Sequence, residues 1–197
     1  MKKITFFLIA LFIVPLYSLA QDVSEHVREI GLNLHSTSNF GIRFKCGNNK
    51  TLLRLTVNSL NGSETHQNGS SYSKSKSFGA GINFGIERRK LISDNLYFYY
   101  GSDILASYNK SSNKLNGEGD NSDWTIAPGI GFVLGLVFNI NSILNVSAEA
   151  MPSIWYSYNE STNSGIIFNK YTNKGINYGL ISPGANITFS YKFGQKN

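Results

Sequence analysis

Six charged residues stand out because each lies in a segment where apolar residues alternate with small or polar ones. They are Glu29, Arg43, Arg54, Glu87, Asp103 and Glu149. Successive side chains of a strand point to opposite faces, so each charge would share a face with Gly, Asn, Ser or Thr. Guanidinium groups in a confined space need carboxylates as counter-charges. We therefore predict an ion-pair network on one face of a sheet, with Arg43 and Arg54 as neighbours at its cationic centre.

The residues that could act in catalysis or bind a metal ion are not spaced as those functions require. Acyl transfer needs a base beside a Ser or Thr and an orienting carboxylate, whereas His26, His35 and His66 are scattered in a chain rich in Ser. There is no Cys pair, no closely spaced His pair and no acidic calcium loop. We predict no catalytic residue, no metal site, no cofactor and no enzymatic activity. The single Cys46 cannot form an internal disulfide, and we interpret it as a small apolar filler.

The first twenty residues have the three parts of a secretory signal peptide. Lys2 and Lys3 form a basic start, residues 4–16 are almost continuously apolar, and Ser18-Leu19-Ala20 offers small residues at a cleavage site. We predict a cleaved signal peptide at residues 1–20 and one mature domain at residues 21–197. The mature chain has a mild basic excess without a basic run, which argues against a nucleic-acid partner.

Alternation with period two extends over most of the mature chain, and no long segment has the apolar period of an amphipathic helix. We expect eight strands at about 29–36, 39–47, 50–60, 76–90, 94–109, 123–139, 142–158 and 177–193. Tight turns are expected at 46–50, 90–94 and 139–141. At the other end lie the short connector Thr37-Ser38 and longer polar loops at 61–75, 110–122 and 159–176. This alternation predicts an all-β fold, an eight-stranded antiparallel up-and-down transmembrane β-barrel.

The orientation of the two strand faces decides between a membrane barrel and a soluble one. Glycines crowd the polar face, which suits a narrow interior, and charged residues make up only 15% of the chain, against about 25% in soluble domains. We therefore predict that the apolar face meets lipid. Outward aromatic residues would form two girdles, with Trp124 and Tyr156 at similar height near the outer edge. The periplasmic girdle would contain Phe44, Phe98, Phe138, Tyr191 and Phe193.

Three segments carry a resemblance to a known family: Phe40-Gly41-Ile42-Arg43-Phe44-Lys45, Phe78-Gly79-Ala80-Gly81-Ile82 and the closing Ile187-Thr188-Phe189-Ser190-Tyr191-Lys192-Phe193. With the export signal, they make the chain resemble the small outer-membrane β-barrel (porin-like) family of Gram-negative bacteria and, in strand count, the OmpA/OmpX-type barrels. The resemblance implies a location in the outer membrane, contact with outer-membrane lipid, and recognition of the last strand by the barrel-assembly machinery. The usual pattern ends on the aromatic residue, whereas four residues follow Phe193 here.

The function expected from these features is a non-enzymatic role in envelope structure or in surface interaction. Loops on a rigid scaffold commonly carry binding function, and Tyr72, Phe168 and Tyr171 are candidate contacts with an extracellular ligand. The ion pairs would close the interior of a monomeric barrel. Two alternatives stay open: a narrow porin-like solute channel, and a soluble periplasmic barrel that binds a small apolar ligand.

Overall fold

The computed structural model describes residues 26–34, 40–67, 73–115, 118–164, 168–180 and 186–193. The predicted signal peptide, the connector at Thr37-Ser38 and the four residues after Phe193 lie outside these ranges. No helix among the described residues is long and apolar enough to cross a membrane. The strands are β1 (His26–Leu34), β2 (Phe40–Asn48), β3 (Thr51–Gln67), β4 (Ser73–Ser93), β5 (Leu96–Leu115), β6 (Glu118–Asn139), β7 (Leu144–Ala150), β8 (Pro152–Ser164), β9 (Phe168–Leu180) and β10 (Asn186–Phe193).

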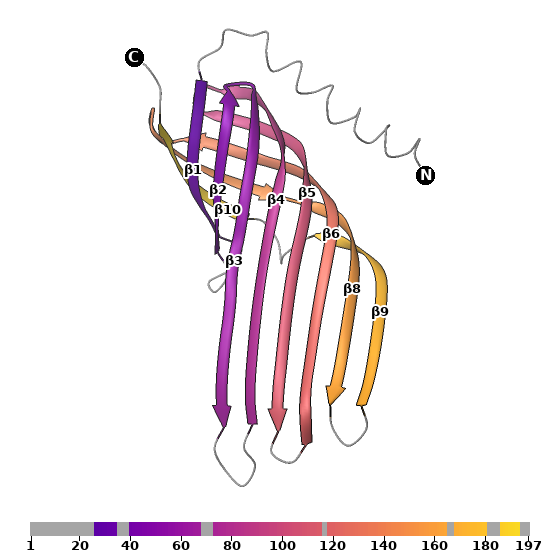
Figure 1. Ribbon diagram of the computed structural model, residues 1–197. Helices are drawn as coiled ribbons and strands as arrows, with labels where there is room; N and C mark the ends of the chain where they lie inside the picture. Colours follow the sequence, from indigo (N-terminus) through magenta and orange to yellow (C-terminus); the bar gives the residue numbers. More distant parts are fainter. Residues whose placement is uncertain are drawn as a thin grey trace.

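Strands β1 to β7 and β10 close into an antiparallel ring in which β10 pairs with both β7 and β1 (Figure 1). The two remaining strands, β8 and β9, continue β7 and β10 beyond this ring. The long strand β6 therefore pairs with β7 through residues 134–139 and with β8 through residues 121–131. The prediction of an eight-stranded barrel is confirmed, with the seventh and eighth strands each divided in two. Pro152, which has no backbone N–H to donate, begins β8 at the first division.

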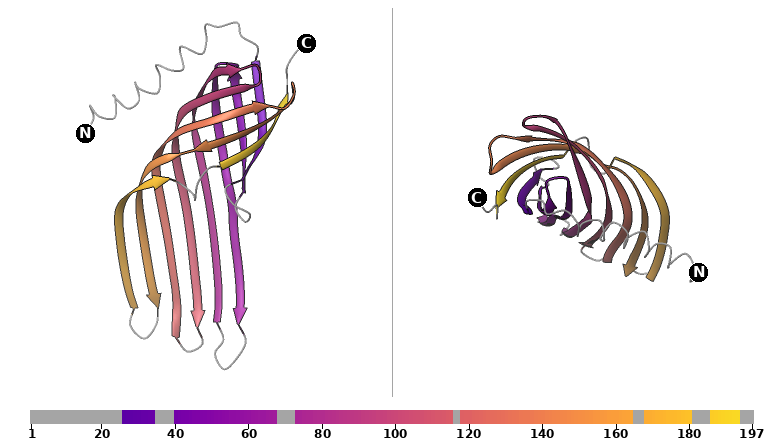
Figure 2. Two further views of the ribbon diagram at one scale, coloured as in Figure 1. Left: turned by 180° about the vertical axis from the view of Figure 1, so that it is seen from behind. Right: turned by 90° about the horizontal axis from the view of Figure 1, so that it is seen from above.

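Six strands continue past the β1–β2 hairpin and form a curved, open sheet, which we call the extension (Figure 2). It comprises residues 61–67, 73–79, 109–115, 118–125, 159–164 and 168–173. The boundary with the rest of the sheet is the row of directly paired residues Asn61, Gly79, Asn109, Thr125, Asn159 and Asn173. The loops expected at 61–75, 110–122 and 159–176 are wrong for most of their residues, because these residues are in strands. Lys, Ser and Asn alternate there, so the strands lack the apolar period by which strands are recognised in sequence.

The turns at the opposite end of the barrel, which we call the closed end, are short, as predicted. In the β2–β3 turn the side-chain oxygen of Asn48 accepts two backbone N–H bonds, the shorter one from Thr51 at 2.7 Å. Asn141 does the same in the β6–β7 turn. Such local bonds are the reason that Asn favours turns. Gly47 has a φ of 154°, and a Cβ there would collide with the carbonyl oxygen of Thr51.

Most of the side chains buried inside the ring are polar or charged, and apolar side chains cover its outside. Arg43, Arg54 and Glu87 are at most 1% exposed, whereas Ile130 and Phe132 are 53% and 58% exposed. A soluble barrel that binds an apolar ligand would need the reverse arrangement. The outward apolar surface is instead the one that a transmembrane barrel presents to lipid.

Candidate functional site

The ring encloses a cluster of charged side chains in which cations and anions balance. The cations are Arg43, Lys45, Arg54 and Arg89, and the anions are Glu29, Glu87, Asp103 and Glu149. Each of these side chains is at most 5% exposed. The structure thus brings together the six residues of the network expected from the sequence and adds Lys45 and Arg89. We call this group the lumen cluster.

Glu149 on β7 is the acceptor that joins the two central arginines. Arg43 donates to both of its carboxylate oxygens, at 2.6 and 2.9 Å, and Arg54 donates to one of them at 3.0 Å. The hydroxyl of Tyr99 adds a bond of 2.9 Å. Paired bonds from one guanidinium are among the strongest that a carboxylate accepts. Arg43 and Arg54 are diagonal neighbours on adjacent strands, since Lys45 is the residue directly opposite Arg54.

Glu87 on β4 organises the second half of the lumen cluster. It accepts bonds of 2.7 Å from Lys45 and from Arg89, and it lies 3.5 Å from Arg54. Arg89 also binds both carboxylate oxygens of Glu29 at 2.8 Å. Arg54 links the halves, because its guanidinium touches Glu87 and Glu149 together. The network therefore connects strands on opposite parts of the barrel wall.

Asp103 lies at the edge of the lumen cluster, with one carboxylate oxygen 3.2 Å from Nε of Arg54. The contact is an ion pair without the geometry of a good hydrogen bond, and neither carboxylate oxygen has a hydrogen-bond partner among the described residues. A buried carboxylate held mainly by charge is more weakly fixed than one with directed donors. Asp103 is therefore the least constrained anion of the lumen cluster.

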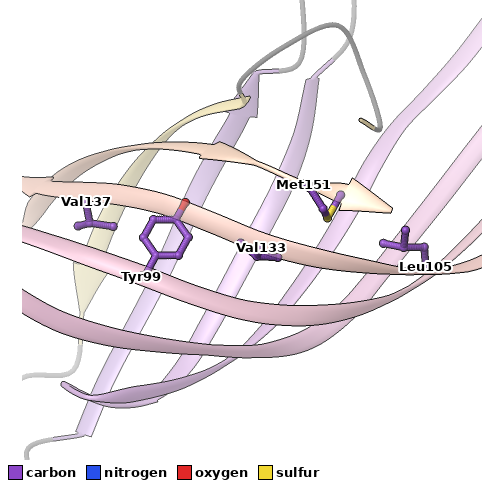
Figure 3. Packing of buried hydrophobic residues seen from close by; sticks show 5 residues of the cluster. All are labelled: Tyr99, Leu105, Val133, Val137 and Met151. Atoms are coloured by element: carbon purple, nitrogen blue, oxygen red, sulfur yellow. The ribbon is translucent and has the colours of Figure 1, made fainter. Parts of the chain in front are cut away.

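An apolar strip runs along the inside of β5 and β6, and Met151 joins it from the junction between β7 and β8 (Figure 3). It consists of Tyr99, Leu105, Val133, Val137 and Met151, all at most 5% exposed. The Nζ atom of Lys45 lies 5.1 Å from the centre of the Tyr99 ring, which couples the strip to the charges. Beyond Leu105, the next inward residues of β5 are half-buried or exposed. Leu105 and Met151 therefore mark the level at which the filled interior ends.

The same periodicity that identified the six predicted residues could have found those that were missed. Arg89 follows Glu87 by two residues on β4. Lys45 follows Arg43 by two residues on β2, so alternation already predicts it in the lumen, although not as a member of the ion-pair network. Tyr99 likewise shares the inward face of β5 with Asp103. Alternation places all of them in the lumen. Their partners, however, depend on how far each strand is shifted against the next.

The predicted aromatic residues at the closed end gather on the outside of the barrel. The rings of Phe44 and Phe193 are 6.3 Å apart, and Phe98 stacks on Tyr100 at 6.1 Å. Phe138 and Tyr191, the other two predicted members, are exposed on the same outward surface. Such outward aromatic residues suit the boundary between hydrocarbon and water.

At the other end, Trp124 packs on Tyr158 at 5.2 Å, so its partner lies two residues beyond the predicted Tyr156. Tyr156 itself is exposed on the same outward face of β8. Phe78 and Tyr108 continue this outer aromatic row on β4 and β5. These additional aromatic residues could be recognised only after the strand register was known.

Charged side chains begin at the level of the outer aromatic row. Lys110 lies opposite both Phe78 and Trp124 in the cross-strand pairing. Lys76, Phe78 and Lys110 help to line a shallow outward groove of about 480 Å³. Lysines next to an aromatic row fit the level where lipid head groups meet the apolar band.

One ion pair of the extension provides a pH-dependent test of its surface. Nζ of Lys170 lies 2.8 Å from a carboxylate oxygen of Glu160, and this hydrogen bond to the charged form lowers the pKa of Glu160 from 4.5. With a lowered folded-state pKa, the stabilisation is complete above the unfolded value and is lost as the pH falls through the lower value. An NMR titration of Glu-labelled protein should therefore give a Glu160 midpoint below 4.5. Lys170→Met should return it toward 4.5, and a midpoint at 4.5 before substitution would contradict the pairing.

The remaining candidates for chemistry form no site among the residues that the structure describes. His26 is exposed at the start of β1, and His35 and the side chain of His66 lie outside the described residues. Cys46 is half-buried with a free thiol. Within the described ranges, no group of three or more His, Cys, Asp or Glu residues is arranged to hold a metal ion.

Comparisons with known proteins concern the fold alone. No protein-family model matches the chain, and no curated protein matches its sequence. A major outer membrane protein from Thermus thermophilus matches with a TM-score of 0.52 and 8% identity, over 85% of this chain and 99% of that one.

Two further solved structures match less closely. Ail, the attachment invasion locus protein of Yersinia pestis, has a TM-score of 0.38 at 13% identity, over 87% of this chain and 100% of its own. Neisserial surface protein A has a TM-score of 0.33 at 15% identity, over 86% and 95%. The closed ring, the outward apolar surface and the Thermus likeness together show that this chain has the fold of a small, eight-stranded outer-membrane β-barrel.

Proposed function

We propose that this chain is a non-enzymatic outer-membrane protein whose closed barrel anchors the extension at the cell surface. The extension, in place of the loops expected from the sequence, is the part that binds a partner. Its exposed Tyr171 remains a candidate contact, whereas Tyr72 and the side chain of Phe168 lie outside the described residues. A rigid sheet that projects from a fixed base holds its binding groups in constant relative positions.

The lumen cluster is the observation that carries this proposal. Its ion pairs and the apolar strip beside them fill the ring, as side chains do in barrels of eight strands. A solute channel would need a continuous water-filled path through the same space. The four cations and four anions of the lumen cluster also balance, so the cluster itself would favour neither sign of solute.

Planar-bilayer recording tests the closed lumen directly. We expect the reconstituted protein to show no large, stable openings, because the lumen cluster links opposite walls of the ring. Heat-modifiable gel mobility of the same sample controls for correct folding. Stable openings from folded protein would contradict the anchor and favour the narrow solute channel.

The location in the membrane is part of the proposal and has its own support. The exposed apolar surface requires a lipid environment, the lysines beyond the outer aromatic row suit anionic head groups, and residues 1–20 would direct export. The closed end would then face the periplasm and the extension would face outward. Recognition of β10 by the barrel-assembly machinery and a monomeric state belong to the same proposal. Recovery of folded, monomeric protein in buffer without detergent would contradict it.

A further inference from the structure

The two faces of the extension differ in charge. Charged side chains at and beyond the outer aromatic row lie on the convex face: Glu64, Lys74, Lys76, Lys110, Lys114, Asp120, Glu160, Lys170 and Lys174. On the concave face, Asp123 is the single charge among the described side chains. The other described side chains there include Ser63, Thr65, Ser75, Ser77, Asn109, Ser111, Asn113, Asn121, Thr125, Ser157, Asn159, Ser161, Asn163, Asn169, Tyr171, Asn173 and Asn177.

Hydrogen bonds between these side chains hold part of the concave face in a fixed arrangement. The amide of Asn159 donates to the hydroxyl of Thr125 at 3.1 Å, and the amide of Asn177 donates to the hydroxyl of Ser157 at 2.9 Å. An amide has two N–H donors and an acceptor oxygen, so one such bond does not exhaust it. The concave face therefore presents hydrogen-bond donors and acceptors in fixed orientations, and most of these groups are uncharged.

Trp155 provides an aromatic surface at the base of this polar face. It is half-buried on β8, between Gly129 of β6 and Asn177 of β9. A Cβ at Gly129 would lie 2.7 Å from the Cβ of Trp155, and one at Gly179 would lie 3.9 Å from the outer edge of the indole. The ring thus extends toward β9 beside two residues without side chains. Its neighbours Ser153 and Met151 along the chain are buried, so Trp155 stands where the filled interior gives way to the open concave face.

We propose that the concave face of the extension binds a neutral glycan chain, with Trp155 as the stacking platform and the Asn, Ser and Thr side chains as hydrogen-bond partners. This inference rests on the proposed surface-binding function and names its ligand class. The C–H face of a sugar ring is apolar and packs on an indole, whereas its hydroxyl groups both donate and accept hydrogen bonds. The amides of Asn159 and Asn177 and the carboxylate of Asp123 supply the matching groups.

Other classes of ligand match the concave face less well. An anionic polymer would meet no cation among its described side chains and would be repelled by Asp123. Among the described side chains of this face, a cationic partner would find one carboxylate, and an apolar peptide would find mainly Trp155 and Tyr171. Glycans on neighbouring membrane lipids would first reach the convex face, because that face is the outside of the barrel. We therefore assign the ligand to free glycan chains in the external medium.

The two tryptophans of the sequence allow a direct test, because Trp124 lies on the convex face and Trp155 on the concave face. Trp124→Phe leaves Trp155 as the sole tryptophan. This variant, folded in a detergent without a sugar head group, would be titrated with maltohexaose, cellohexaose, chitohexaose and mannohexaose. At least one of these neutral hexasaccharides should shift the Trp155 emission to shorter wavelength and protect the ring from acrylamide.

The hexasaccharide that alters Trp155 emission would then be titrated by calorimetry into the unsubstituted protein and its variants. Trp155→Ala should weaken binding by about tenfold, which corresponds to about 1.4 kcal/mol, because the variant lacks the indole surface on which the sugar ring packs. Trp124→Phe should leave binding unchanged. Hexagalacturonate, the anionic counterpart, should not bind.

Two outcomes would overturn the glycan assignment: none of the neutral hexasaccharides alters Trp155 emission, or hexagalacturonate binds as tightly as they do. Neither result affects the planar-bilayer recording. A wrong ligand class can therefore be distinguished from a lumen that is not closed. Equal loss of binding in the Trp124→Phe and Trp155→Ala variants would also contradict a site on the concave face.

Discussion

Replacement of Glu149 by Ala should destabilise the folded barrel by about 3–5 kcal/mol, the cost of removing one partner from a buried ion pair. Arg43 would lose two hydrogen bonds and Arg54 one, and the lumen would keep an excess positive charge that water cannot reach. The loss exceeds that of a single hydrogen bond because two cations depend on this carboxylate. Urea unfolding in lipid vesicles, followed by heat-modifiable gel mobility, measures the change.

Two variants control for the interpretation of the Glu149 result. Glu149→Gln retains the size of the side chain but not its charge, so it should also be destabilised. Asp120→Asn removes the exposed ion pair with Lys114 on the extension and should leave the unfolding midpoint nearly unchanged, because exposed pairs contribute little. A Glu149→Ala protein as stable as the unsubstituted one would show that the lumen cluster does not hold the barrel together.

Gly101→Val should destabilise the barrel by about 3 kcal/mol, the upper part of the usual range for overpacking. A Cβ at Gly101 would collide with the backbone carbonyl oxygen of Ile86 on the neighbouring strand. This oxygen belongs to the β4–β5 ladder, so it cannot move aside as the end of a flexible side chain can. Unfolding in urea and the yield of folded barrel during refolding both measure the effect.

Gly175→Val is the matched control, since Gly175 is also an inward-facing strand glycine. A Cβ at Gly175 would meet only the hydroxyl of Ser157, at 3.6 Å, which is ordinary contact. Its stability should therefore change by less than about 0.5 kcal/mol. Equal losses in the two variants would mean that strand propensity, and not the close approach of Ile86, sets the cost.

Alternation alone predicted most of the barrel, because a membrane imposes opposite chemistry on the two faces of each strand. Arg43 lies between the apolar residues Ile42 and Phe44, so its face could be assigned without knowledge of any contact. The same reasoning placed Glu87 and Glu149 inside. The fold and the content of the lumen therefore follow from local pattern.

The extension could not be predicted in this way, because water reaches both of its faces. Around Lys110 and Lys114, outward lysines alternate with inward Ser and Asn, and both sets are polar. The ion-pair partner of each charged residue in the lumen could not be predicted from the sequence either. Glu149 meets Arg43 only because of the accumulated shift of the strands around the ring, which no single segment of sequence encodes.

The closure of β10 on β1 has a consequence for biogenesis. Thr188 donates a hydrogen bond to Asn33, so residues 155 positions apart in the chain must meet before the ring is complete. Contacts of such high contact order form late and slowly, since the intervening polypeptide loses its freedom first. Until then, the first strand keeps an open edge on which another chain can add, so the nascent protein needs protection from aggregation for as long as its two outermost strands remain apart.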